Sequence, residues 1–256
     1  MKNQAAISAP RSVVHRVDGR ANVIGRDVSS GDPLVDALRR VDTPTLANAI
    51  DTLAVRSRAS GFCSREMRQL IPELGTLCGY AVTVQAIAMT PDTVLDRGEA
   101  VDRYLEVCAA LAASPSPAVV VFQETGPFPE YSVHLGEVLA TLFRRFGATG
   151  VVSNGAVRDL AQIRTLGFHA FAPGTVASRA NLAVLRVQTP VTVCGLTVHP
   201  GDLLHGDENG LITVPAEGRE RLPELAERVS SAERRVLDYL AGDDVTLDGV
   251  RDRMVH

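Results

Sequence analysis

Short, continuous apolar runs of the kind that fill the middle of a parallel sheet constrain the fold of this chain most. Ala118–Phe122 reads AVVVF, and Val151–Ser153 enters a second strand after Gly150. A strand that is buried on both faces is apolar at nearly every position. Between these two runs, apolar residues recur at helical spacing on one face: Leu135, Val138, Leu139, Leu142, Phe143 and Phe146. This strand–helix–strand order predicts an α/β fold.

Elsewhere in the chain, helical and strand patterns mix without strict alternation. We expect helices that start at Thr43-Pro44 and that cover 101–113, 158–166 and 217–240. We expect strands over 79–88, 168–171, 191–198 and 211–214. The mixture predicts a layered α/β domain whose sheet is covered by helices, rather than a plain Rossmann sheet. We assign 1–33 to a polar N-terminal extension, 34–240 to the domain and 241–256 to a C-terminal tail.

Composition excludes several classes of function. A formal net charge of −4 over 256 residues provides no general attraction to nucleic acid or to an anionic membrane. No apolar run approaches the roughly 20 residues that span a bilayer, and the N-terminus lacks the apolar core of a secretory signal. The four cysteines form no C-x-x-C pair. We therefore expect a cytoplasmic protein with neither nucleic acid nor membrane as a partner.

Lysine is almost absent, which restricts the chemistry further. Lys2 is the only lysine, and the other 25 basic residues are arginines. Schiff-base catalysis needs an amine that is held in a pocket, so lysine-dependent aldolases and pyridoxal-phosphate enzymes are disfavoured. A G-x-x-x-x-G-K-[ST] phosphate loop is excluded for the same reason. If the protein acts on a carbonyl group, the electrophile must be a metal, an arginine or backbone amides.

The segment 136–174 carries most of the chemistry-bearing residues. Gly136-Glu137 stands at the expected start of a helix, where free backbone N–H groups and the helix dipole favour an anion. Asn154-Gly155 forms a tight turn directly after a buried strand. This turn places the residues that follow it at the carboxyl end of the strand, where α/β proteins bind ligands.

Arg158 and Asp159 follow that turn and are the strongest candidates for a site. An arginine holds a carboxylate through two parallel hydrogen bonds. An aspartate ligates a hard cation such as Mg²⁺, and Glu137 is a second carboxylate for the same ion. An Arg-Asp pair at a helix start is also compatible with a plain cap and a solvated arginine, so the residues alone leave both readings open.

Gly136-Glu137, twenty further residues and then Arg158-Asp159 resemble the acid–x₂₀–Arg-Asp signature of the 4-hydroxy-4-methyl-2-oxoglutarate aldolase/RraA-like family. Further similar segments are spread over roughly 40–240, which is most of the chain: Thr43–Thr45, 79–84, 150–159, 166–174 and 200–215. The resemblance implies an α-β-β-α layered sandwich of the swivelling phosphohistidine-domain type. It also implies a homotrimer or hexamer, in which Glu233 on the last long helix is our candidate to reach a neighbour's site.

The activity that this resemblance implies is that of a class II pyruvate aldolase. Such an enzyme cleaves a 4-hydroxy-2-oxo acid to pyruvate and a carbonyl product, and it can also decarboxylate oxaloacetate. In this sequence, Asp159 would bind Mg²⁺ or Mn²⁺, and Arg158 would grip the pyruvate unit. Glu137 would support the water shell of the metal.

The resemblance also assigns the substrate carboxylate and the neighbouring polar groups. Gly136 and the backbone amides of Val138 and Leu139 would receive the substrate carboxylate. A metal-bound water, positioned through Glu137 or Gln162, would take the proton of the 4-hydroxyl group.

Three departures from the family pattern leave the substrate open. Gln162 replaces a common acid, Pro173 replaces a common arginine, and Asn48 replaces an acid of the early helix. One alternative is a non-catalytic regulator that binds a ribonuclease, as some members of the family do. Another is a lyase for a different hydroxy-oxo acid.

The histidines add little to this picture. His134 precedes the expected site helix, where a structural role or support of the site from behind is expected. Ser132 and His134 lack a G-x-S-x-G elbow, so they do not indicate a hydrolase triad.

Overall fold

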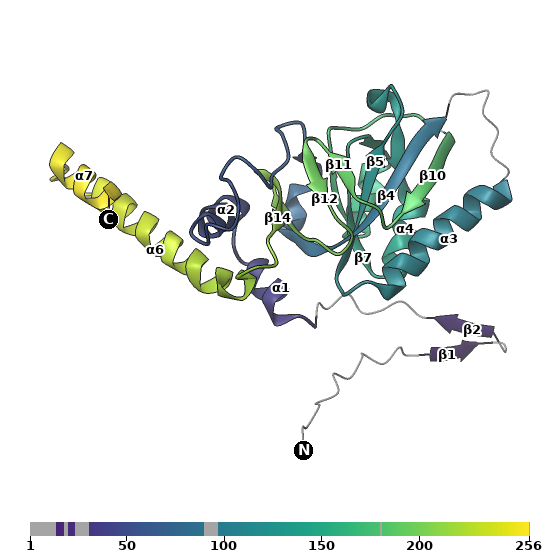
Figure 1. Cartoon of the computed structure of the whole chain (residues 1–256), viewed down its shortest axis with the longest axis horizontal. Helices are drawn as coiled ribbons and strands as arrows, with labels where there is room; N and C mark the ends of the chain where they lie inside the picture. The colour runs from purple at the N-terminus through teal and green to yellow at the C-terminus, as the bar shows by residue number, and fades with distance from the viewer. Residues whose placement is uncertain (1–13, 18–19, 24–30, 90–96, 180, 256) are drawn as a thin grey trace, which may run out of the picture.

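The computed structural model describes residues 14–17, 20–23, 31–89, 97–179 and 181–255 (Figure 1). Lys2 and most of the predicted N-terminal extension lie outside these residues. Within the extension, β1 (Val14–Val17) and β2 (Arg20–Val23) pair antiparallel. Among the described residues, no helix has the length and apolar character that a membrane crossing requires.

One large sheet organises the domain in the strand order β14-β13-β4-β5-β7-β9-β3, with β10 paired to β4. Four strands run parallel in its centre: β4 (Leu77–Met89), β5 (Ala118–Glu124), β7 (Ala148–Ser153) and β9 (His169–Ala172). Antiparallel strands flank them: β3 (Arg68–Gln69), β10 (Asn181–Val187), β13 (Leu203–Asp207) and β14 (Gly210–Val214). The apolar run AVVVF therefore lies at the centre of the sheet, as its composition predicts.

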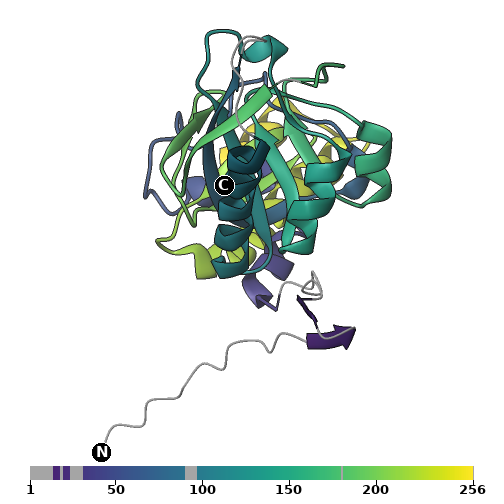
Figure 2. The same ribbon diagram turned by 90° about the vertical axis from the view of Figure 1, so that its right-hand side faces the viewer.

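Alternate residues of β5 pack into two different cores. Val120 and Phe122 face a cluster that includes residues of α3 (Arg97–Ala113), α4 (Glu137–Arg145) and α5 (Leu160–Thr165). Val119 and Val121 face the hairpin of β11 (Val191–Val193) and β12 (Leu196–Val198). This alternation follows from the two-residue period of a strand. Figure 2 shows α3 and other helices in front of the sheet.

A third core lies on the other side of the antiparallel strands. It joins α1 (Pro33–Leu38), α2 (Thr43–Asp51) and α6 (Leu222–Leu240) to residues of β13 and β14. The side chain of Asp42 caps α2 by accepting the Thr45 N–H, and Pro44 lies in the first turn, as the sequence predicts. Beyond α6, α7 (Leu247–Val255) forms in the predicted tail (Figure 1). The predicted layered α/β architecture is confirmed.

Several predicted boundaries were wrong, each for a local reason. The segment 191–198 is a hairpin rather than one strand, because Cys194 and Gly195 both have positive φ and reverse the chain. Strand β10 has no counterpart among the predicted elements. The amphipathic helix begins at Glu137, so Leu135 belongs to the short strand β6 (Val133–Leu135). Val138, predicted on the buried face, is 80% exposed.

Candidate functional site

A short parallel strand pair joins the two halves of the sequence signature. Strand β6 pairs with β8 (Ala156–Val157) in the register Val133 to Ala156 and Leu135 to Val157. The Arg158 N–H also donates to the Leu135 carbonyl at 2.9 Å. Because the two strands are parallel, their C-terminal ends are adjacent, and the residues that follow each strand lie side by side. The twenty-residue spacing therefore places Gly136-Glu137 next to Arg158-Asp159.

Asp159 supplies a carboxylate at the N-terminus of α4. Its Oδ2 accepts the backbone N–H of Glu137 at 3.0 Å and lies 3.6 Å from Arg158 Nε. Gly136, the residue at the N-cap of α4, has no side chain, so Asp159 caps the helix from another segment. Asp159 itself adopts φ 59° and ψ 38°, a left-handed conformation that Asp and Asn tolerate better than most residues. This conformation directly precedes α5, which begins one residue later.

Gly136 is required by the closeness of this contact. A Cβ at position 136 would lie 2.6 Å from Asp159 Oδ2 and 2.9 Å from Arg158 Nε. Any side chain there would push the carboxylate and the guanidinium away from the helix start. The glycine of the signature thus permits the ion pair to approach the backbone, in addition to exposing the N–H groups.

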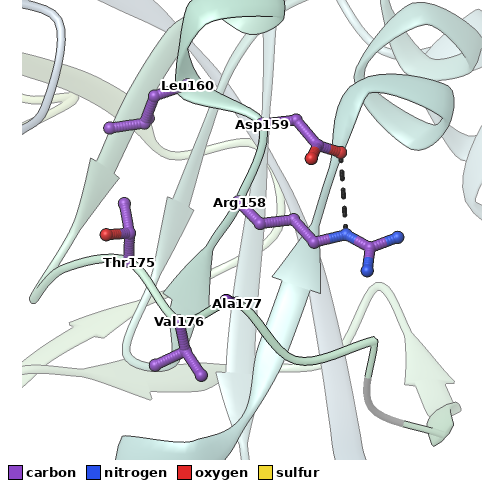
Figure 3. Close-up of a pocket in the computed structure, with 6 residues that line it drawn as sticks. All are labelled: Arg158, Asp159, Leu160, Thr175, Val176 and Ala177. Atoms are coloured by element: carbon purple, nitrogen blue, oxygen red, sulfur yellow. Dashed lines mark ion pairs between the residues drawn. The ribbon is translucent and has the colours of Figure 1, made fainter.

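The Arg158–Asp159 pair lines an open pocket of about 400 Å³. The other lining residues are Leu160, Thr175, Val176 and Ala177. In Figure 3, the two charged side chains extend to one side with their ion pair marked, while Leu160 and Thr175 lie to the other. Both charged side chains are a little over one-third exposed: 38% for Arg158 and 34% for Asp159. The pocket therefore offers a cation and an anion to a ligand that enters from solvent.

A second contact holds the guanidinium against the pocket wall. Arg158 Nη1 donates to the Ser178 carbonyl at 3.2 Å. This bond fixes the far end of the side chain to the segment that carries Thr175, Val176 and Ala177. An arginine that is held at both Nε and Nη1 presents its remaining donors in a defined direction.

The donor set determines which metal would fit here. Within the described residues, no group of three or more His, Cys, Asp and Glu side chains comes together as a metal site. This finding argues against a closed zinc site, which takes four protein ligands. One exposed carboxylate beside an open pocket matches Mg²⁺ or Mn²⁺, because such ions take oxygen ligands and retain several waters. Asp159 is the residue that would hold the ion.

The other predicted site residues lie on α4, α5 and α6, outside the set of residues that line the pocket. Glu137 occupies the first turn of α4 with an exposed side chain, and Leu139 packs partly against the core. Gln162 is exposed on α5 and is not among the residues that line the pocket. Glu233 on α6 is exposed, and its Oε1 accepts a hydrogen bond from Asn48 of the same chain at 3.3 Å. The roles of these residues stay predictions.

Sequence reasoning missed a buried polar network behind the site. His134 Nε2 lies 3.0 Å from Glu124 Oε2, and His134 Nδ1 lies 2.8 Å from Ser153 Oγ. The side chains of His134 and Glu124 are 0% exposed. The sequence shows that His134 precedes the site helix, but it gives no sign of the partners of its side chain. Glu124 and Ser153 each end an apolar strand, and no spacing in the sequence pairs them.

The Glu124 carboxylate is stabilised in its charged form despite its burial. Burial alone raises its pKa, but hydrogen bonds from His134, Ser132 and the Gly126 N–H outweigh that effect and lower the pKa below its ordinary value. The Gly126 N–H donates to Oε1 at 2.6 Å, and the Ala88 N–H donates to Oε2 at 2.9 Å. A buried carboxylate with this many donors is an ordered structural element.

The family model described as RraA-like: Aldolase/RraA matches residues 43–213. The chain belongs to the RraA-like family. The matched residues contain both halves of the site, from the N-terminus of α4 to Asp159 and the pocket wall at 175–177. The family predicted from the signature is thereby confirmed.

Two curated relatives and one solved structure illustrate the range of this family. An uncharacterized protein of Methanocaldococcus jannaschii is 33% identical over 101 residues, which are 39% of this chain and 49% of that protein. A protein of Halalkalibacterium halodurans, named as a candidate 4-hydroxy-4-methyl-2-oxoglutarate aldolase, is 23% identical over 122 residues, 47% of this chain and 58% of that protein. The chain thus spans about half the length of these curated relatives.

The structural match extends further along the chain. Streptomyces coelicolor RraAS2, described as an unusual member of the RNase ES inhibitor RraA protein family, superposes with a TM-score of 0.59 at 25% identity. The match covers 82% of this chain and 98% of RraAS2. The RraA-type α/β fold that the resemblance implied is therefore shown.

Proposed function

We propose that this protein is a divalent-metal-dependent lyase, a class II aldolase that cleaves a 4-hydroxy-2-oxo acid to pyruvate and a carbonyl product. The observation that carries the proposal is the placement of Arg158 and Asp159 together at the N-terminus of α4, on the rim of an open pocket. Membership of a family that contains a relative named as an aldolase supports it. The same site would decarboxylate oxaloacetate, because both reactions leave negative charge on a pyruvate unit.

The reaction needs electrophilic groups around the 2-oxo acid. The bond between C3 and C4 breaks, its electron pair moves onto the pyruvate unit, and the 4-hydroxyl group loses its proton as C4 becomes a carbonyl. A Mg²⁺ or Mn²⁺ ion held by Asp159 would supply a Lewis acid that polarises the keto oxygen. Protonation at C3 then completes pyruvate.

Arg158 has the clearest role among the residues of the chain. Its guanidinium is held by Ser178 and by its ion pair, so it can bind the carboxylate and keto oxygens of the pyruvate unit without reorganising. Fixed donors of this kind stabilise charge that develops in the transition state. The N–H groups of Val138 and Leu139, in the first turn of α4, would add to the binding of the substrate carboxylate.

Glu137 and Gln162 are proposed to handle the hydroxyl proton. Glu137 lies in the first turn of α4, beside Asp159, and its carboxylate can accept a proton directly or through one water. Gln162 can orient a water but cannot accept a proton.

The proposed oligomeric state is a homotrimer or hexamer, in which Glu233 of one chain approaches the pocket of a neighbour.

A panel of substrates tests the proposal. Pyruvate release would be followed from 4-hydroxy-4-methyl-2-oxoglutarate, from 4-hydroxy-2-oxo acids with uncharged substituents and from oxaloacetate, each with Mg²⁺, with Mn²⁺ and with EDTA. We expect release that depends on the metal and stops with EDTA. Protein that is folded and releases no pyruvate from any of these compounds would contradict the proposed activity.

A second candidate function is regulation of a ribonuclease by direct binding. The likeness to RraAS2, a protein described as a member of an RNase ES inhibitor family, is the observation that favours it. A ribonuclease E-type enzyme would be assayed with and without an excess of this chain. Inhibition in the absence of any lyase activity would favour the regulator over the lyase.

A further inference from the structure

The buried network of Glu124, His134 and Ser153 has no part in the chemistry proposed above. Each of its three side chains comes from a different strand: Glu124 ends β5, Ser153 ends β7, and His134 is the middle residue of β6. His134 and Ser153 are 1% and 0% exposed, so no substrate reaches them. A serine, a histidine and a glutamate in this order resemble a hydrolase triad, but their complete burial excludes that reaction.

The hydrogen-bond donors in the network can be assigned from its partners. Ser153 Oγ accepts the Gly155 N–H at 3.0 Å, so its own O–H is free to donate to His134 Nδ1 at 2.8 Å. His134 Nε2 then carries the hydrogen and donates to Glu124 at 3.0 Å. With this assignment every donor has an acceptor, which buried polar groups require.

The network is continuous with the backbone that carries the site. Two residues beyond Ser153 the chain turns at Gly155, and the Ala156 N–H then donates to the Ser132 carbonyl at 2.7 Å. The Arg158 N–H donates to the Leu135 carbonyl at 2.9 Å. His134 therefore lies inside the strand pair β6–β8, whose two ends deliver Glu137 and Asp159.

Close approaches show how little freedom the network has. A Cβ at Gly155 would lie 2.9 Å from His134 Cε1, and a Cβ at Gly126 would lie 2.7 Å from Glu124 Oε1. The turn after β7 is thus pressed against the imidazole ring, and the loop after β5 is pressed against the carboxylate. A shift of the ring would move the turn that leads to Arg158 and Asp159.

We propose that His134 is a positioning residue, held by Glu124 and Ser153, that sets the register of β6 on β8 and thereby holds the Asp159 carboxylate against the first N–H of α4. The catalytic consequence of this inference rests on the proposed function, whereas the structural consequence does not. Loss of the Ser153–His134 bond should loosen the 154–159 segment and weaken the contact between Asp159 and the Glu137 N–H. A misplacement of about 1 Å at a catalytic site can lower turnover by as much as about a hundredfold.

A second buried histidine provides a matched control. His205 Nδ1 bonds Thr43 Oγ1 at 3.0 Å, and His205 Nε2 bonds the Leu38 carbonyl at 3.1 Å. His205 is 0% exposed and belongs to β13, in the core that contains α1 and α2. Thr43→Val removes the hydroxyl group that is hydrogen-bonded to a buried histidine, as Ser153→Ala does. Thr43, however, lies outside the strand pair that carries the site.

Hydrogen–deuterium exchange on the full-length protein, read by mass spectrometry on peptides that cover 136–139 and 154–159, tests the inference directly. We expect Ser153→Ala to speed exchange in both peptides at least about tenfold, and Thr43→Val to leave both unchanged. Steady-state kinetics should show kcat/KM for pyruvate release reduced about tenfold or more by Ser153→Ala, mainly through kcat. Thr43→Val should retain wild-type kinetics at a comparable loss of thermal stability.

Equal exchange in the two variants and the wild type would overturn the positioning role. Faster exchange in a protein without lyase activity would support the positioning role and contradict the proposed function, so the two failures are distinguishable. If Ser153→Ala does not fold, Ser153→Cys keeps most of the volume and replaces the hydroxyl by a weaker donor. The same two peptides then decide the outcome.

Discussion

Two carboxylates near the α4 N-terminus differ sharply in how their hydrogen-bonding capacity is used. Glu124 is completely buried and accepts from the Ala88 N–H, the Gly126 N–H and His134. Asp159 is 34% exposed, accepts one backbone N–H and has a guanidinium nitrogen at 3.6 Å. Hydrogen bonds from the protein therefore occupy the acceptor positions of Glu124, whereas Asp159 stays accessible to a ligand.

This difference separates the scaffold from the site. A buried carboxylate with complete hydrogen bonding contributes order and is costly to disturb, because loss of a partner leaves an uncompensated charge. An exposed ion pair contributes little to stability, since water competes for both groups. Changes at Glu124 should therefore reduce stability first, and changes at Asp159 or Arg158 should reduce activity first.

The largest expected effect is on activity at Arg158. Arg158→Ala should lower kcat/KM for pyruvate release by about 10²- to 10³-fold, because it removes fixed donors that stabilise developing charge. Its free energy of unfolding should change by less than about 1 kcal/mol, since the ion pair is exposed. Arg158→Lys is the matched variant: it keeps the charge, loses the planar fork and should recover only part of the activity. Full activity in Arg158→Ala would remove this residue from the mechanism.

The next effect is on stability at Glu124. Glu124→Gln places an amide NH₂ among backbone donors, so the variant should lose about 3 kcal/mol of unfolding free energy in urea titrations. Glu130→Gln, an exposed change in the adjoining turn η2 (Pro129–Tyr131), should be close to neutral. A Glu124→Gln protein as stable as the wild type would show that the buried Glu124 carboxylate does not stabilise the fold.

A smaller effect concerns pH and two histidines, the half-buried His169 and the buried His205. Burial, with a smaller contribution from the positive charge of Arg39, lowers the pKa of His169 to about 4. Burial also lowers the pKa of His205. Because the unfolded chain binds these protons near pH 6.5 and the folded chain does not, stability is complete above that pH and falls as the pH drops toward 4.

Unfolding titrations at pH 7 and pH 5 measure this dependence. We expect His169 to account for a loss of about 1–2 kcal/mol between the two values. His169→Phe keeps a flat ring and removes the titration, so its pH dependence should be shallower by that amount. An identical slope in the variant would place the titrating group elsewhere.

The smallest expected effect is at Gln162, which is exposed and, unlike Asp159, does not line the pocket. Gln162→Ala should reduce kcat by about fivefold or less, because it orients a water and carries no charge. Gln162→Glu is the informative partner, since it adds a carboxylate that can accept a proton. A loss as large as that of Arg158→Ala would give Gln162 a direct catalytic role.

Much of the fold was predictable because its cause is local and repetitive. The AVVVF run, the amphipathic pattern before Gly147 and the Thr43-Pro44 helix start each express one periodicity or one cap, and the structure has the corresponding elements. The hairpin at Cys194-Gly195 was missed because a non-glycine residue with positive φ gives no signal in composition. Strand β10 was missed because its partner, β4, lies about a hundred residues earlier in the chain.

The candidate site divides in the same way. Arg158 and Asp159 were identified because their spacing from Gly136-Glu137 matches a family signature, and the strand pair β6–β8 explains that spacing. The Glu124–His134–Ser153 network depends on residues of β5, β6 and β7, which meet only after these strands have packed together. Single residues at the ends of apolar runs do not reveal which of them will face one another.

Asp159→Asn provides the most direct test of the account. Asn tolerates the left-handed conformation of position 159 and can still accept the Glu137 N–H, so the variant changes charge with little change in shape. The measurement is Mg²⁺-dependent pyruvate release by the wild type and by Asp159→Asn, with Mn²⁺ binding followed in parallel by calorimetry. We predict that the wild type binds Mn²⁺ and releases pyruvate, and that the variant loses both properties while it unfolds at a similar temperature. A variant that binds Mn²⁺ and releases pyruvate as the wild type does would contradict a metal-dependent lyase built on Asp159.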